Sequence, residues 1–202
     1  MSINSPKPAK NQLTSDSTSA KSIAIIYHSA FGHTAKVAHA IQLGVSSQVE
    51  AHVIKVADLT AGSPDAERLW AQIDAADALV FGSPTYMGSV SAEFKTFMDG
   101  SSKRWMQRSW VGKWAAGFTV SGGLSGDKLQ VLQQLCLFSM QHGMNWASLP
   151  LMSTGSAITD LNRLGSHMGL MAQADDAHPD ETPPLGDIKT AEWFGTHLAT
   201  LI

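Results

Sequence analysis

Residues 23–38, IAIIYHSAFGHTAKVA, combine an apolar run, a short polar turn and the start of a helical pattern. The run is rich in isoleucine and is bounded by polar residues, which is typical of a buried strand. Val37, Ile41 and Val45 then recur at the spacing of one helix face. The turn carries hydroxyl side chains and Gly32, but no lysine or arginine. A strand that leads directly into a helix places free backbone amides and the positive end of the helix dipole at this turn.

The same alternation of apolar runs and helical patterns continues along the chain. The sequence predicts strands at 22–29, 50–57, 77–84, 113–121 and 145–151, and helices at 33–47, 64–76, 91–104, 127–141 and 188–201. Pro64 suits the first turn of its helix, and we expect Asp127 to cap the fourth helix. Most strands are apolar on both faces, which is typical of a parallel sheet covered by helices on both sides. We therefore predict an α/β fold with a doubly wound, five-stranded parallel sheet.

Composition argues against several classes of protein. The chain has 202 residues, of which 15% are charged and 44% hydrophobic, and its net charge is −3. These values predict one globular domain without the basic stripe of a nucleic-acid-binding protein. Cys136 is the only cysteine, so no intrachain disulfide can form, and its apolar helical context favours a buried core residue over a nucleophile. The histidines show no metal-ligand spacing, so we expect no metal site.

The sequence also bears on location. No apolar run has the length of a membrane span. Residues 1–20 lack the apolar stretch of a signal peptide and are rich in serine, threonine, lysine and proline. We therefore expect a disordered tail at 1–20, one domain at 21–202 and a cytoplasmic location.

Three loops are the places where a ligand is expected. In open parallel sheets, ligands bind at the carboxyl ends of strands where the strand order reverses, which singles out 29–34, 84–91 and 119–126. In the first loop, Ser29 and Thr34 add hydroxyls to the amides of the helix start, which together make an anion site without a cationic side chain. An ordinary capped helix start explains this loop equally well. The chain lacks G-x-x-x-x-G-K-[ST] and G-x-G-x-x-G, which argues against a Walker-type triphosphatase and a dinucleotide Rossmann site.

The other two loops suit a flat ring. Tyr86 and Met87 occupy the tip of an excursion between Pro84 and Gly88. An aromatic ring and a thioether at such a tip suit the face of a flat ligand, although packing on a neighbouring surface is the alternative. The third loop is rich in glycine, which either lets the backbone approach a ligand or forms a flexible turn. Together the three loops predict a phosphorylated, flat aromatic ligand.

These stretches resemble the flavodoxin-like family, and more closely its WrbA-type NAD(P)H:quinone oxidoreductases and the NADPH-dependent FMN reductases. The resemblance is carried by YHSAFGHT at 27–34, FGSPTYMGSVSAEFKTFMD at 81–99, Trp105, the glycine loop at 121–126 and QHGM at 141–144. It implies a sheet order of 2-1-3-4-5 and FMN as the cofactor. The residues that it places around FMN are Ser29, Phe31, Gly32, His33 and Thr34 at the phosphate, Pro84, Thr85, Tyr86, Met87 and Gly88 at the ring and ribityl chain, and Val120, Ser121, Gly122, Gly123, Leu124 and Ser125 at the other edge of the ring.

The resemblance also implies an activity, the transfer of two electrons from NAD(P)H to a quinone or similar small acceptor by a ping-pong mechanism. Trp105 and Gln141 would line the space above the flavin, and His142 would donate a proton or hydrogen bond to the acceptor. From the sequence, His142 fits slightly better as a structural histidine at a helix end, and Trp105 fits a core or interface position equally well. A flavodoxin-type electron carrier and a flavin-free interaction module are the alternative functions.

Two further features bear on assembly and redox role. The basic, aromatic stretch 103–114 and the long segment 152–187 predict a homo-oligomer, a dimer or tetramer, with flavin sites near subunit contacts. We expect segment 152–187 to lie over the active-site edge or at a subunit contact. The three loops contain no Asp or Glu, so an anionic reduced flavin would meet no like charge there, which favours two-electron over one-electron chemistry.

Overall fold

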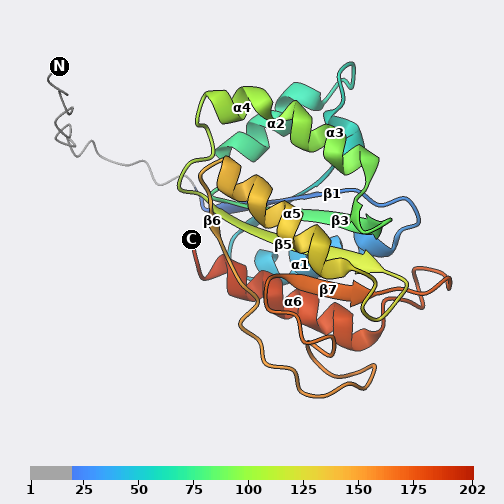
Figure 1. The fold of residues 1–202 in the computed structure, drawn as a ribbon. Helices are drawn as coiled ribbons and strands as arrows, with labels where there is room; N and C mark the ends of the chain where they lie inside the picture. Colours follow the sequence, from blue (N-terminus) through green and yellow to red (C-terminus); the bar gives the residue numbers. More distant parts are fainter. Residues whose placement is uncertain (1–19) are drawn as a thin grey trace, which may run out of the picture.

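The computed structural model describes residues 20–202, and Figure 1 shows a sheet between layers of helices. The disordered tail predicted for residues 1–20 lies, apart from Ala20, outside the described residues. Within 20–202, no helix combines the length and apolarity needed to cross a membrane.

Strands and helices alternate over most of the chain as predicted, and the strands at 89–90 and 170–173 were not predicted. The strands are β1 (Ser22–Tyr27), β2 (Glu50–Lys55), β3 (Ala78–Tyr86), β4 (Ser89–Val90), β5 (Trp114–Ser121), β6 (Asn145–Trp146) and β7 (Leu170–Gln173). The helices are α1 (His33–Ser46), α2 (Ala66–Ala75), α3 (Ala92–Gly100), α4 (Ser102–Met106), α5 (Lys128–Gln141) and α6 (Leu185–Ala199), with a 3₁₀ turn η1 (Val56–Leu59).

The sheet has the predicted doubly wound topology, with the order β2-β1-β3-β5-β6 and parallel pairing along that path. The fifth strand differs from the prediction, because it is divided into two pieces. Trp114 at the start of β5 pairs with Asn145 of β6, whereas Phe118 further along pairs with Leu170 of β7. The predicted strand 145–151 is therefore wrong beyond residue 146.

The break in the fifth strand has a local cause. Ala147 still donates its amide to the carbonyl of Ala115 at 2.8 Å, but Leu149 donates to His167 instead of the sheet. Pro150 has no amide hydrogen and cannot continue the ladder. The chain therefore leaves the sheet over residues 147–169, which we call the excursion, and returns as β7.

Two apolar cores hold the helices against the two faces of the sheet. In Figure 1, α1 and α6 lie together on one side, and α2 and α3 lie on the other. Helices α1 and α6 cross with their backbones almost touching, because a Cβ on Gly44 would lie 1.9 Å from the carbonyl oxygen of Glu192. The predicted inward positions Val37, Ile41 and Val45 of α1 are fully buried in this layer.

Several helix ends differ from the predictions. Asp127 has a left-handed backbone with φ 53° and its side chain makes no capping hydrogen bond, so the predicted cap is wrong. Helix α2 begins at Ala66, after Pro64. The helix predicted at 91–104 is two helices that meet at Ser101, whose hydroxyl donates to the carbonyl of Met98 at 2.7 Å. Cys136 is buried, as predicted.

Candidate active site

A cleft of about 570 Å³ lies where the carboxyl ends of β1, β3, β5 and β7 meet. Because these strands are parallel, the loops that follow them converge at one edge of the sheet. The cleft brings together ten of the residues expected to bind the cofactor, namely Ser29, Phe31, His33, Thr34, Pro84, Thr85, Tyr86, Val120, Ser121 and Gly122. The other six belong to the same three loops, namely Gly32, Met87, Gly88, Gly123, Leu124 and Ser125.

One end of the cleft is built to receive an anion. Gly32 precedes α1 with φ 94°, and no side chain caps this helix. The first backbone bond of α1 runs from the amide of Lys36 to the carbonyl of Gly32 at 2.9 Å. Among residues 20–202, no acceptor bonds the amides of His33, Thr34 and Ala35, which precede it. These amides and the nearby hydroxyls form a donor set that fits a phosphate.

The middle of the cleft is formed by the hairpin of β3 and β4. Thr85 Oγ1 lies 2.8 Å from Thr119 Oγ1, which ties β3 to β5 at the cleft floor. Met87 at the hairpin tip is fully exposed and has φ 48°, a backbone conformation that is unfavourable for residues other than glycine. Burial raises the pKa of the Tyr86 phenol, and the Glu93 carboxylate raises it further. Tyr86 is therefore a neutral hydrogen-bond donor at the cleft.

A fourth wall of the cleft, residues 174–179, belongs to the segment 152–187 that we expected over the active-site edge or at a subunit contact, although none of its residues was among the predicted site residues. Helix α1 holds this turn, because His33 Nε2 donates to the carbonyl of Ala177 at 2.9 Å and Lys36 donates to the carbonyl of Asp180 at 3.2 Å. The wall brings Asp175 and Asp176 to the cleft, both exposed. The premise that no carboxylate lies at the site holds for the three loops but not for the cleft as a whole.

Two residues that were not predicted from the sequence bind the glycine loop after β5 by hydrogen bonds. Lys128 Nζ donates to Ser121 Oγ at 2.7 Å and to the carbonyl of Gly123 at 2.6 Å. Gln173 Nε2 donates to the carbonyl of Gly122 at 3.0 Å. The contact of Lys128 has a weak sequence signal, a lysine at the first turn of a helix where an acidic residue is usual. Gln173 has no such sequence signal, because its place beside the glycine loop follows from the return of the chain as β7.

Three predicted residues do not join the cleft. His142 is buried near the start of β5, where its Nε2 lies 2.9 Å from Ser101 Oγ and its ring packs 4.3 Å from that of Trp110. Gln141 is exposed beside it, and Trp105 is 46% exposed on α4. The cleft lies at the other end of β5, roughly 25 Å away for eight residues of strand. Within one subunit, none of the three can contact a ligand in the cleft.

The environment of His142 is that of a structural residue. Burial, together with the positive charge of Arg108, lowers the pKa of the His142 imidazole to about 4. The ring also makes an edge contact with Phe138 at 4.9 Å. A neutral ring between two aromatic side chains contributes packing rather than a proton at neutral pH.

Comparisons with known proteins agree with this geometry. The model of the family described as NADPH-dependent FMN reductase matches residues 21–155. The flavodoxin FldP of Pseudomonas aeruginosa is 34% identical over 180 residues, covering 88% of this chain and 94% of the relative. An NAD(P)H dehydrogenase (quinone) of Syntrophus aciditrophicus is 26% identical and covers 89% of this chain and 96% of that protein. The crystal structure of a flavodoxin, WrbA-like protein from Agrobacterium tumefaciens superimposes with a TM-score of 0.69 at 36% identity, covering 90% of this chain and 96% of that one.

Proposed function

Because the chain belongs to the NADPH-dependent FMN reductase family, we propose that it passes two electrons from NAD(P)H to a quinone or similar small acceptor by a ping-pong mechanism. Membership of this family makes it a flavodoxin-like oxidoreductase with FMN as its cofactor. When bound, FMN accepts a hydride from the nicotinamide and passes two electrons to the acceptor, while the protein supplies position and electrostatics.

The observation that carries the proposal is the open apolar rim of the cleft. Phe31 and Tyr86 line the cleft, Met87 follows Tyr86 at the hairpin tip, and all three are exposed. Side chains of this kind favour stacking of a flat ring from solvent. A nicotinamide and a quinone are both flat, and the same rim would serve both in turn.

The residues of the cleft divide the work of holding the flavin. The amides of His33, Thr34 and Ala35 would bind the phosphate, because they are the donors without an acceptor at the end of β1. The hairpin tip would border one side of the ring, and the glycine loop at 121–125 would border its other edge. Relatives named NAD(P)H dehydrogenase (quinone) support a quinone as the class of acceptor.

Steady-state kinetics tests the shared space. If donor and acceptor occupy one rim, plots of reciprocal rate against reciprocal NAD(P)H concentration should be parallel at several fixed quinone concentrations. Intersecting lines would mean separate pockets and would overturn the ping-pong mechanism. Met87→Ala should raise KM for both substrates several-fold, whereas Leu43→Ala, which removes an equally apolar exposed residue of α1, should leave both unchanged.

An electron carrier is the second candidate function. The relative at 34% identity is named a flavodoxin, and Asp175 and Asp176 place carboxylates at the cleft. Negligible rates with every quinone, together with reduction of the bound flavin by single electrons from a reductase, would support the carrier. A purified protein without flavin absorbance would contradict both functions. The cytoplasmic location and the homo-oligomer stay predictions.

A further inference from the structure

Lys128 is a buried cation next to the candidate cleft. Its side chain is completely buried at the first residue of α5, and both of its hydrogen-bond partners, Ser121 Oγ and the carbonyl of Gly123, are neutral. Among residues 20–202, no carboxylate lies within 4 Å of its amino group. A buried charge without a counter-ion is costly, so its retention here indicates an electrostatic role.

The nearest charges do not neutralise Lys128. Asp187 is 1% exposed and accepts from Arg163, itself 5% exposed, at 2.7 Å and 3.1 Å. Burial lowers the pKa of Lys128 to about 8, Asp187 opposes this and Arg163 adds to it, so the lysine still carries its proton at pH 7. The carboxylate therefore balances only one of the two cations, and the group keeps one net positive charge.

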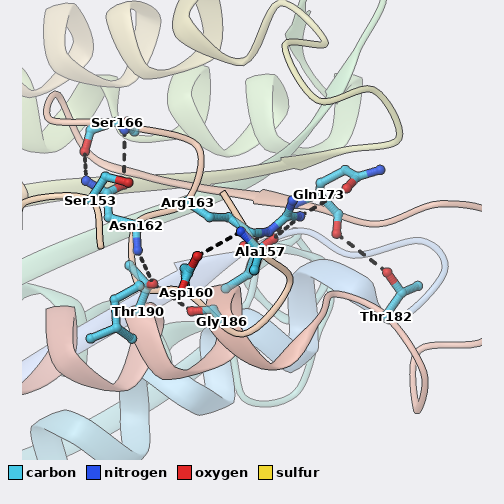
Figure 2. A network of polar contacts seen from close by, with 12 residues as sticks. Ser153, Ala157, Asp160, Asn162, Arg163, Ser166, Gln173, Thr182, Gly186 and Thr190 are labelled. Atoms are coloured by element: carbon cyan, nitrogen blue, oxygen red, sulfur yellow. Dashed lines mark hydrogen bonds and ion pairs between the residues drawn. The ribbon is translucent and has the colours of Figure 1, made fainter. Parts of the chain in front are cut away.

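Both cations are linked by hydrogen bonds to the glycine loop, Lys128 directly and Arg163 through Gln173. Figure 2 shows Arg163 directed at Gln173, whose Oε1 it bonds at 3.0 Å. Gln173 in turn donates to the carbonyl of Gly122, and Lys128 bonds the residues on either side of Gly122. Ser121 and Gly122 line the cleft. The net positive charge thus lies directly behind the glycine loop.

We propose that Lys128 is a positioning and electrostatic residue that stabilises the reduced, anionic form of the flavin held against the glycine loop. This inference rests on the proposed function. A hydride adds two electrons and one proton to oxidised FMN, so the reduced cofactor gains one negative charge as NAD(P)⁺ forms. A fixed, buried cation favours that charge more strongly than a cation in water.

The carboxylates of the fourth wall oppose this effect only weakly. Asp175 and Asp176 are exposed, so solvent and salt screen their charge. Lys128 is buried and is screened much less. The buried cation should therefore dominate the balance at the loop.

The test is the flavin's two-electron midpoint potential in Lys128→Met and Lys128→Gln. Both substitutions remove the charge, and glutamine keeps a hydrogen-bond donor for the loop. We expect the ratio of affinities for reduced over oxidised FMN to fall about tenfold in both variants, which is a drop of about 30 mV for a two-electron couple. Lys128→Arg, which keeps the charge, should restore most of the difference.

A purely structural lysine gives a different result. It would weaken binding of both redox forms of FMN equally and leave the potential unchanged, and that outcome would overturn the inference. Lys113→Met is the matched control, because Lys113 is a partly buried lysine that also bonds backbone carbonyls, those of Asp74 and Ala76, but at the opposite end of β5. Its potential should equal that of the unmodified protein. Absence of FMN binding in the unmodified protein would instead contradict the proposed function.

Discussion

Gly32 sets how closely the fourth wall approaches the start of α1. Its φ of 94° is unfavourable for any other residue, and a Cβ there would lie 2.7 Å from Cγ of Pro179. A larger side chain must therefore either strain the turn or push the wall away from the phosphate end of the cleft. Both changes disturb the free amides of α1.

We expect Gly32→Val to purify with less FMN than the unmodified protein. Gly62→Val is the matched control, since Gly62 has φ 93° but no atom within 4 Å of an added Cβ, so it shares the backbone strain without the clash. The ratio of flavin to protein absorbance measures occupancy. Full flavin content in Gly32→Val would show that the phosphate does not bind at this turn.

His142 gives a prediction about pH and stability. Its folded pKa of about 4 lies below the usual 6.5, so the unfolded chain binds more protons between these values. The stability that the neutral ring contributes is complete above pH 6.5 and is lost as the pH falls toward 4. By pH 5 the loss should reach roughly 2 kcal/mol.

Urea unfolding at pH 7.5 and pH 5.0 measures this loss. His142→Gln should be less stable than the unmodified protein at pH 7.5, because packing against Trp110 is lost, but should lose less on acidification. His39→Gln, at an exposed histidine of α1, should retain the full pH dependence. An unchanged dependence in His142→Gln would mean that another group causes it.

At the scale of elements, the strands and helices that the sequence predicts well are those whose burial follows from the pattern of their own residues. The apolar runs of β1, β3 and β5 are visible because each is buried on both faces, and the helix at 33–46 shows its inward face in sequence. The return of the chain as β7 depends on pairing with β5 across more than 45 residues, which no local period records. The fourth wall follows β7, and its individual residues could not be assigned to the site for the same reason. Segment 152–187 was correctly expected at the active-site edge only in its part at 174–179.

The excursion is fixed to the rest of the fold by buried polar contacts. In Figure 2, the amide of Asn162 donates to Thr190 Oγ1 of α6 at 2.8 Å, and Asn162 Nδ2 donates to the carbonyl of Ser166 at 3.0 Å. Arg163 beside it pairs with Asp187, which also accepts from the amide of Gln173 at 2.8 Å. These contacts hold β7, and with it the fourth wall, in position.

We expect Arg163→Met to lower the free energy of unfolding by about 3–5 kcal/mol, because it leaves the buried Asp187 carboxylate without its partner. Arg163→Met with Asp187→Leu should lose less than the single change, since no lone charge remains. Arg68→Met is the control, because its pair with Asp65 is exposed and should contribute within about 1 kcal/mol. Urea unfolding of the four proteins decides this, and equal effects of Arg163→Met and Arg68→Met would contradict the buried-pair argument.

At the scale of the whole molecule, the predicted site residues are divided between the two opposite ends of the sheet. The cleft lies at the carboxyl ends of the strands. Trp105 belongs to α4, and Gln141 and His142 stand at the end of α5, just before β6. Figure 1 shows α4 and β6 at the opposite end of the sheet from the strand arrowheads. Trp105 and Met106 of α4 are exposed, 46% and 73%, which is unusual for large apolar side chains next to one another. The resemblance that placed Trp105 above the flavin is compatible with this structure only if α4 reaches the cleft of a neighbouring subunit.

This requirement makes the predicted homo-oligomer testable together with Trp105. Light scattering at high protein concentration should give a multiple of the chain mass of 21.5 kDa. Trp105→Ala should then change the rates with both NAD(P)H and quinone while leaving FMN bound, because the phosphate end of the cleft lies in the other subunit. Trp193→Ala is the matched control, since Trp193 stacks on His197 within α6, a helix that contributes no residue to the cleft lining, and its rates should not change. A monomer at high concentration, or unchanged rates in Trp105→Ala, would leave α4 without a role at the flavin, and the cleft of each chain would have to act alone.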